Sequence, residues 1–437
     1  MQALIDSHAP FRQFQPGTAL PWLEARRAVG LARAERLGWP TTRLEPWKFT
    51  NLAKLSRMQF EPATPASANN FIDVLPTVVA QGNPASHRLV FVNGFWRSDL
   101  SSPGRLPGGV TLTGLAATLA GDPILAEAYL GQVALPDDHA LAALNTAFLT
   151  DGPLLVIGEK VEVKNPIELI MISAGSADQP LIAHPRLIIT AGPYSQATVI
   201  EHHISLGDHV MLSNAVTELS VGIGAELRHY KVQREHDNAF HLATTVGRLE
   251  RAAVYEGFLL TLGARLSRNE VRLVLDGVDA RARLSGAYLV ENGRHADTTT
   301  LIEHAKPRGT SRQVFKGVIG GKSRGVFQGK IIVRPDAQKT EGYQLHRALL
   351  LTDDARIDAK PELEIYADDV KCSHGATAGD LDDDALFYLR ARGIDRDGAR
   401  ALLIGAYVNE VLAEISDSTV QAYFENLAAT RLGTDKE

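Results

Sequence analysis

Gly325-Val-Phe-Gln-Gly-Lys-Ile-Ile-Val333 is one of many short runs in the middle of the chain that place Gly or Ala at a break and then alternate apolar with polar residues. This alternation indicates β-strands, because successive side chains of a strand point to opposite faces. Comparable runs begin at Leu154, Pro166, Arg186, Ala197, Ala225, Ala264 and Ala280. No clear helix separates them, so the region from about 153 to 366 is predicted to consist of strands.

Three architectures are compatible with so long a series of short strands: a barrel, a sandwich and a parallel β-solenoid. A solenoid should show a regular spacing between breaks. However, 28 residues separate Ala197 from Ala225 and only 16 separate Ala264 from Ala280. The spacing alone therefore leaves the solenoid no better supported than the other two folds.

The regions on either side of the strands are predicted to be helical. Pro21 can begin an amphipathic helix that stops at Gly38-Trp-Pro40, and Asn93-Gly94 predicts a hairpin turn near 88–97. Three helical segments near the C-terminus each follow a capping residue, namely Asp382 or Asp383, then Asp395, then Asp417 or Ser418. We therefore expect a mostly helical domain at 1–150, a β core at 151–366 and a helical domain at 367–437.

The charge balance excludes some classes of partner. The 437 residues include 45 Lys and Arg against 51 Asp and Glu, a net charge of −6. This balance disfavours broad binding to nucleic acid or to an anionic membrane surface. The start of the chain lacks the pattern of a secretory signal, and no run of about 18 apolar residues predicts a membrane span. We expect a cytoplasmic protein with neither nucleic acid nor membrane as a partner.

Two groups of residues suggest binding chemistry but have simpler explanations. Gly317-Val-Ile-Gly-Gly-Lys-Ser323 is one residue short of a phosphate-binding loop and has strand-like flanks, so a Gly-rich turn explains it better and a partner must bind any ATP. Several histidines gather in the strand region: His202, His203, His229, His236, His241, His295 and His304. Stacked coils could bring some of them together, but each one taken singly is explained by an ordinary buried or surface histidine.

Lys371-Cys-Ser-His-Gly375 is the most distinctive local feature. Cys372 and His374 would share one face of a strand, where a thiol and an imidazole could bind iron or zinc. Two ligands do not complete a tetrahedral shell, so others would have to come from elsewhere, for example from a second subunit. Cys372 is the only cysteine, which excludes a Cys-rich site within one chain. A buried cysteine in a turn remains the alternative explanation.

The region around this pair resembles a known family. Pro361–Gly379, followed by Leu386–Ile394, closely resembles the SufB/SufD family of iron–sulfur cluster assembly proteins. Further similar segments are Glu45–Thr50, Val92–Gly94, Leu144–Phe148, Leu266–Asn269, His295–His304, Lys316–Gly317, Gly325–Lys330 and Ala337–Thr340. SufB-like chains usually have Cys-Glu-His-Glu-Ala where this chain has Cys372-Ser-His-Gly-Ala376, and they carry further cysteines for sulfur transfer. The chain therefore resembles the SufD-like member more closely.

The resemblance implies a right-handed parallel β-helix flanked by helical domains. It also implies a non-catalytic scaffold subunit of an ATP-driven assembly complex. Such a subunit would pair with a SufB-like subunit through the β-helix edge, which we expect near 331–366. It would bind a SufC-like ABC ATPase through the C-terminal helices and pass clusters to carrier proteins. We expect deletion of residues 380–437 to abolish ATPase binding while the β-helix stays folded.

The resemblance also implies which residues contact the cluster. His374 is the main candidate ligand, because it would face a cysteine of the partner subunit, and Cys372 is a weaker candidate. The cofactor would be a transient iron–sulfur cluster, made of iron and sulfide and shared between the subunits. A flavin is suggested by the resemblance alone, since the sequence has no G-x-G-x-x-G fingerprint.

Two other functions remain as alternatives. A β-helix enzyme acting on polysaccharide would use clustered carboxylates, for which Asp276, Asp279, Glu291 and Asp297 are candidates. A structural β-solenoid would assemble with copies of itself. The helical C-terminal region and the Cys372-Ser-His374 segment argue against the enzyme, and a homopolymer instead of a heteromeric complex would distinguish the structural solenoid.

Overall fold

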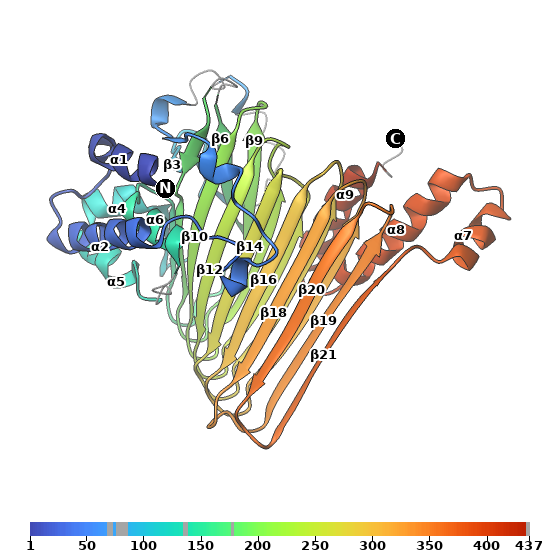
Figure 1. The fold of residues 1–437 in the computed structure, drawn as a ribbon. Coiled ribbons are helices and arrows are strands. Elements are labelled where there is room, and N and C mark those ends of the chain that lie inside the picture. Colours follow the sequence, from blue (N-terminus) through green and yellow to red (C-terminus); the bar gives the residue numbers. More distant parts are fainter. Residues whose placement is uncertain (68–72, 76–85, 134–138, 176–178, 434–437) are drawn as a thin grey trace.

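The computed structural model describes residues 1–67, 73–75, 86–133, 139–175 and 179–433. Its main body is a parallel β-solenoid in which successive strands fall alternately into two sheets (Figure 1). The first sheet has the strand order β20-β18-β16-β14-β12-β10-β8-β5-β4, and the second has the order β21-β19-β17-β15-β13-β11-β9-β6-β2-β3. The predicted class, a mainly β protein with a parallel β-helix between helical regions, is confirmed.

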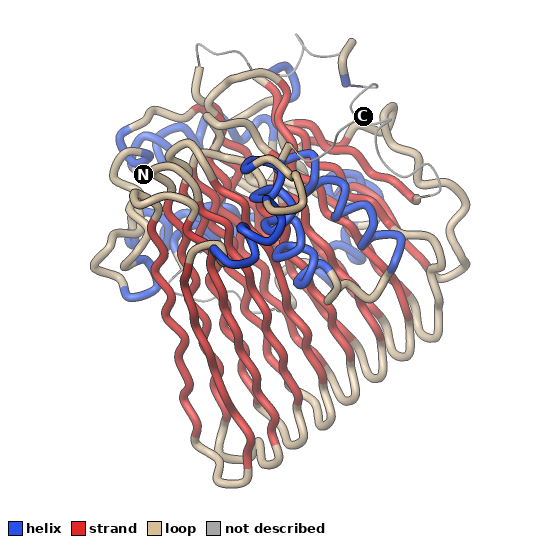
Figure 2. Tube along the Cα trace, turned by 90° about the vertical axis from the view of Figure 1, so that its right-hand side faces the viewer, coloured by secondary structure: helices blue, strands red, loops and turns tan. Residues whose placement is uncertain are grey.

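The strands from β9 to β21 are eight to eleven residues long and lie side by side (Figure 2). The first sheet contains β4 (Val110–Gly114), β5 (Pro153–Ile157), β8 (Arg186–Ala191), β10 (Met211–Val221), β12 (Phe240–Leu249), β14 (Leu266–Leu275), β16 (His295–His304), β18 (Arg324–Val333) and β20 (Arg356–Ile365), with the short β1 (Glu61–Pro62) and β7 (Leu181–Ala183) beside them. The second contains β2 (His87–Val92), β3 (Phe95–Trp96), β6 (Ile167–Ala174), β9 (Gln196–Leu206), β11 (Glu226–Arg234), β13 (Val254–Thr261), β15 (Arg281–Val290), β17 (Thr310–Ile319), β19 (Thr340–Leu350) and β21 (Val370–Gly379).

One turn of each coil repeats the same backbone conformation. It contains a residue with positive φ, namely Lys160, Tyr194, Gly224, Ala252, Asp279, Arg308 or Lys339. From Tyr194 to Lys339 the steps are 30, 28, 27, 29 and 31 residues. Each of these N–H groups donates to a carbonyl in the turn of the next coil, as Ala252 does to Val278 at 2.9 Å. The turns therefore form a hydrogen-bonded ladder that helps to fix the register between coils.

Aliphatic side chains stack inside the solenoid at matching positions of successive strands. In the first sheet one such row consists of Leu155, Ile189, Leu219, Leu273, Ile302, Ile331 and Leu363, and Gly247 stands at the matching position of β12, where Leu219 and Leu273 fill the space of the absent side chain. Burying one leucine or isoleucine side chain contributes about 1.5–3 kcal/mol. Each coil is covered by the coil that follows it, except the last one of the described chain. Leu363 in that last coil is therefore only partly buried.

The two ends of the solenoid differ. At the N-terminal end, β3 pairs antiparallel with β2 through the predicted Asn93-Gly94 turn, and β4 pairs antiparallel with β5. At the C-terminal end, β20 and β21 are the last strands of the two sheets among the described residues. Strand β21 lies beyond the predicted boundary at 366, so the helical region begins only at Asp383. The boundary was placed too early because residues 372–379 are small and lack the apolar alternation of the other strands.

Helices cover the N-terminal end and one side of the solenoid. Those near the N-terminus are α1 (Gln2–Phe11), α2 (Pro21–Leu37), α4 (Leu115–Gly121), α5 (Pro123–Tyr129) and α6 (Ala140–Ala147), and those near the C-terminus are α7 (Asp383–Arg390), α8 (Arg396–Leu412) and α9 (Ser418–Leu432). The side chains of Asp382, Asp395 and Asp417 cap the last three, as predicted. None of the helices in the described ranges has the length and apolar character needed to cross a bilayer.

The segment between α2 and β1 crosses the outer face of the first sheet (Figure 1). Its short 3-10 helix, η2 (Glu45–Trp47), places the Trp47 ring 4.1 Å from the guanidinium of Arg268 on β14. Glu45 pairs with Lys360 on β20. The N-terminal segment Glu45–Thr50, which resembles the family in sequence, therefore links the middle of the solenoid to its last coil.

We predict that Ala252→Gly stabilises the protein. Ala252 has a φ of 57°, where a Cβ atom is strained by about 1 kcal/mol and glycine is not. The matched control is Ala253→Gly at the next residue, which is buried, has no positive φ and should be destabilised. Thermal unfolding followed by circular dichroism should give opposite shifts for the two variants, and a lower midpoint for Ala252→Gly would contradict the ladder as described.

Candidate functional site

The last coil presents two free strand edges of different character. Arg356 begins β20 and Tyr366 follows it, and their N–H groups donate to the carbonyls of Ser323 and Val333 on the β18 side, at 3.1 and 2.9 Å. Because alternate residues of a parallel strand direct their N–H groups to opposite sides, Pro361 stands where an N–H would face outward, and proline has none. Charged side chains flank it. Proline and charge both discourage pairing at an edge, so β20 is protected.

Strand β21 carries no such protection. From Cys372 to Gly379 it contains neither a charged residue nor a proline, and most of these side chains are exposed. It is ten residues long, whereas β3 at the opposite end of the same sheet has two. A long, unguarded edge strand invites another chain to add its own strand.

Cys372 and His374 lie on this edge strand and share one of its faces. Cys372 is in register with Gly342, and His374 is in register with Gln344. Gln344 is fully buried, so the two residues belong to the inward-facing side of the coil. Because no further coil follows among the described residues, Cys372 is only half buried and His374 is exposed. Burial raises the pKa of the Cys372 thiol.

A groove of about 760 Å³ adjoins Cys372 along the starts of the second-sheet strands. Tyr343, Lys371 and several arginines line it. Much of their charge is already balanced, since Arg312 pairs with Glu414 at 2.9 Å and Lys371 with Glu341 at 3.2 Å. The groove gives access to the cysteine without forming a strong anion site.

Helix α7 lies beyond the body of the solenoid (Figure 1), and it exposes apolar side chains. None of its residues is buried, and Phe387 and Tyr388 are 73% and 56% exposed. Leu402 on α8 is also exposed. Large apolar side chains gathered on an exposed helix are typical of an interaction surface.

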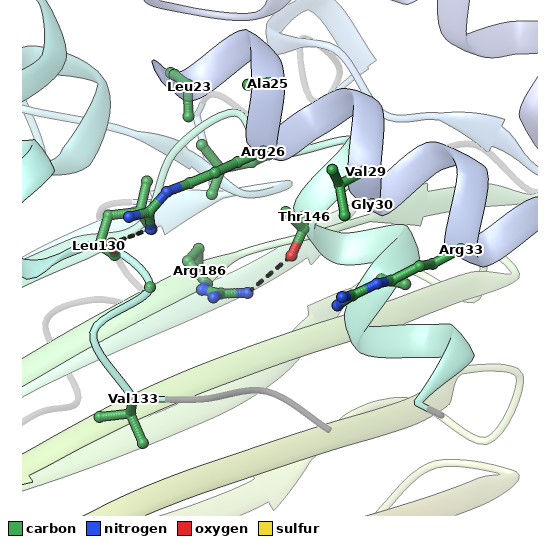
Figure 3. A pocket seen from close by; sticks show the side chains of 13 residues that line it. Leu23, Ala25, Arg26, Val29, Gly30, Arg33, Leu130, Val133, Thr146 and Arg186 are labelled. Atoms are coloured by element: carbon green, nitrogen blue, oxygen red, sulfur yellow. Dashed lines mark hydrogen bonds between the residues drawn. The ribbon is translucent and has the colours of Figure 1, made fainter. Parts of the chain in front are cut away.

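A separate cavity of about 380 Å³ lies between α2, α6 and β8 (Figure 3). Arg26, Arg33 and Arg186 line it among apolar groups. Arg186 is committed to Glu218 at 2.6 Å, and Arg26 donates to the carbonyl of Leu130. The described residues that line it include no His, Cys, Asp or Glu, the side chains typical of a metal ligand.

Two family models match the chain. The SufBD core domain of the SUF system for iron–sulfur cluster assembly matches residues 172–407, and the SufBD protein N-terminal region matches residues 2–169. The chain belongs to the SufBD family. The resemblance inferred from the sequence is confirmed, and membership connects the protein with iron–sulfur cluster assembly.

Curated relatives of this SufBD protein agree with the assignment. A SufBD family protein of Synechocystis sp. is 32% identical over 90% of this chain and 87% of its own length. The cluster assembly protein SufD of Escherichia coli is 32% identical over 87% of this chain and 86% of its own. SufD of Bacillus subtilis is 27% identical over 90% of each chain.

The structure does not gather the carboxylates that the polysaccharide hypothesis requires. Asp276 and Asp279 lie in the turn before β15 and pair with different arginines, whereas Glu291 follows β15 at its other end, about 33 Å away along a ten-residue strand. Asp297 is buried against Arg268. These four residues of the SufBD protein therefore do not form an acid–base pair.

The expected pairing edge at 331–366 is partly wrong. Strand β19, which lies within it, pairs on both sides with β17 and β21. The free edges are β20 and β21, spanning 356–379. Sequence reasoning assigned residues 367–379 to the helical region and so missed that the Cys372-Ser-His374 segment is itself the edge strand.

Proposed function

We propose that this chain is the SufD-like, non-catalytic scaffold subunit of an ATP-driven iron–sulfur cluster assembly complex. The observation that carries the proposal is the unguarded edge strand β21, which bears Cys372 and His374. Iron and sulfide are the substrates, and a second chain completes the site. Transfer of clusters to carrier proteins and a cytoplasmic location remain part of the proposal.

The partner that fits this edge is a SufB-like subunit with a complementary edge. Adding its strand to β21 would give the outward backbone groups partners and cover the last coil. The same asymmetry argues against an open polymer of this chain alone. A head-to-tail polymer needs two open ends, and β3, β4 and helices close the N-terminal end.

His374 is the proposed cluster ligand. Its imidazole is exposed on the inward-facing side of the last coil, where side chains of a docked subunit would meet it. A cysteine from that subunit would supply the thiolate that iron prefers. Cys372 is the weaker candidate, because it is half buried and burial disfavours its thiolate.

The proposed docking surface for a SufC-like ATPase is the exposed apolar group of α7 and α8. The other side chains of these helices have a different task. Val408 of α8 and Phe424 of α9 are buried against Tyr230 and Phe258 on the outer face of the second sheet. Deleting 380–437 would uncover that face, so the expectation that the solenoid folds unchanged without these residues is replaced by one of destabilisation.

A flavin is not part of the proposed mechanism. The groove beside Cys372 is the region that could hold an anionic cofactor, but Arg283 and Arg312 there already pair with Glu256 and Glu414. The residues present do not fit a dedicated phosphate site.

The docking surface can be tested with Phe387→Ala/Tyr388→Ala. Both side chains are exposed, so their removal should leave thermal stability unchanged but weaken ATPase binding at least tenfold in a calorimetric titration. Ile124→Ala, which removes a 79% exposed side chain on α5, is the matched control. Equal affinity of the double variant and the control would disprove the assignment.

The pairing edge can be tested with Ala376→Pro. Glu341 of β19 donates its N–H to Gly309 on the β17 side, and by the same alternation in the next coil the N–H of Ala376 faces outward. Proline should therefore remove a bond to the partner and leave the β19 pairing intact. Ala376→Ser keeps the N–H and serves as control. Co-purification with the SufB-like subunit should fall for proline only, and undiminished pairing would argue against β21.

The ligand assignment predicts that His374→Ala lowers cluster formation strongly while partner binding persists. Cys372→Ala should have the milder effect, since alanine keeps the small apolar character of that position. Iron and sulfide content of the complex purified from cells measures both. Normal cluster content in His374→Ala, or a larger loss in Cys372→Ala, would refute the histidine as the working ligand.

A further inference from the structure

Three potential metal ligands meet inside the solenoid, far along the chain from one another. His203 belongs to β9, Glu235 follows β11, and His241 belongs to β12. One ligand atom from each lies within 4.8 Å of the other two. All three side chains are buried, with exposed fractions of 1%, 4% and 0%. Donor atoms of a tetrahedral shell with bonds of about 2.0 Å lie about 3.3 Å apart, so small side-chain movements would close the group around an ion.

The ring of His241 is the strongest indication that this group binds a ligand. Its Nε2 has no hydrogen-bond partner among the described residues, although the ring is fully buried. Nδ1 lies 2.8 Å from a carboxylate oxygen of Glu235, another member of the group. Buried polar atoms almost always have partners, and a metal ion would provide one here.

The neighbouring residues are arranged as the outer contacts of a metal site usually are. Oε1 of Glu201 lies 2.5 Å from Nε2 of His203, and Gln233 donates its side-chain N–H to Glu235 at 2.9 Å. In metal sites, a ligating histidine commonly donates a hydrogen bond from its second ring N–H to a carboxylate, and ligating carboxylates themselves accept hydrogen bonds. Glu201 and Gln233 are placed to orient His203 and Glu235 in this way.

The charge balance also favours a cation. Two buried carboxylates, Glu201 and Glu235, lie near a single buried ammonium, Lys231, which is 3.3 Å from Glu201. These three groups carry a net charge of −1, which favours a cation over an anion at this position. Glu235 is the first residue of the turn that leads to β12. The next two residues of that turn, His236 and Asp237, are exposed, so the group lies close to solvent.

We propose that His203, Glu235 and His241 bind a divalent transition-metal ion, Fe²⁺ or Zn²⁺, within the solenoid. Two imidazoles and one carboxylate are a ligand set used for both ions, and they leave a position open for water or another ligand. The site does not depend on the proposed function. Five strand spacings separate β11 from β21, so it lies roughly 24 Å from the edge strand that bears His374.

The experiment uses the full-length protein, stripped of metal with a chelator. Co²⁺ absorbs visible light much more strongly with four or five ligands than as the aqua ion, so its binding can be followed by absorbance. The titration with Co²⁺ should saturate at one equivalent in the wild type. Zn²⁺ should then displace it. Fe²⁺ added without oxygen should compete for the same site. Glu235→Gln and His241→Gln keep the approximate side-chain volume and should each lower affinity at least tenfold.

The controls separate this site from its surroundings and from the edge. His236→Gln changes the exposed histidine next to Glu235, and His374→Ala removes the proposed cluster ligand. Both should bind Co²⁺ like the wild type. If a ligand variant does not fold, two measurements on the wild type test the proposal instead. They are the rise of its unfolding midpoint with added Zn²⁺ and the absorption spectrum of its Co²⁺ complex. The proposal is overturned if the wild type takes up no metal, if both folded ligand variants bind normally, or if binding is lost with His374 instead.

Discussion

A strand inside a parallel solenoid takes its backbone hydrogen bonds from the coil before it and the coil after it, and the rest of the structure depends on this requirement. The last rung of the turn ladder joins Lys339 N–H to the carbonyl of Asp369 at 2.6 Å. Past β20 and β21 the described chain offers no further coil. At the N-terminal end, antiparallel strands and helices close the stack instead. The C-terminal end is therefore the end of the stack that the described residues leave uncovered.

The C-terminal helices could have supplied that cover, but they lie on the side of the solenoid. Phe424 of α9 packs 5.9 Å from the Phe258 ring on β13, and Lys316 of β17 donates to the carbonyl of Tyr407 on α8 at 2.9 Å. These contacts hold α8 and α9 across the second sheet (Figure 2). As a result α7 extends outward, and the edge strands remain free. The position of the helices separates a lateral surface, suited to one partner, from an end surface, suited to another.

Features that depend on a few neighbouring residues could be predicted from the sequence. Features that depend on the alignment of one coil with the next could not. Asp382, Asp395 and Asp417 were recognisable as caps, and Asn93-Gly94 as a turn, because each acts within four residues. The number of residues in each coil could not be read from the sequence. The positive-φ position of successive turns is occupied by Tyr194, Gly224, Ala252, Asp279, Arg308 and Lys339, so the backbone repeats while the residue type does not. Ala264 lies in the opposite turn of its coil, and counting it with Ala225 and Ala280 mixed two series.

The two proposed metal-binding regions illustrate the same limit and differ in how firmly they would hold an ion. Cys372 and His374 were found from the sequence because they are two residues apart on one strand. His203, Glu235 and His241 meet only because β9 and β11 align Gln233 with His203 while β12 belongs to the opposite sheet. The inner group offers three ligands from one chain in a buried place, which suits an ion that stays. The described residues of the edge offer two, so an ion held there under the proposed function would be released when the second chain withdraws. A scaffold that builds a cluster and gives it away needs the second kind of site at its interface, and the edge strand of this protein has that character.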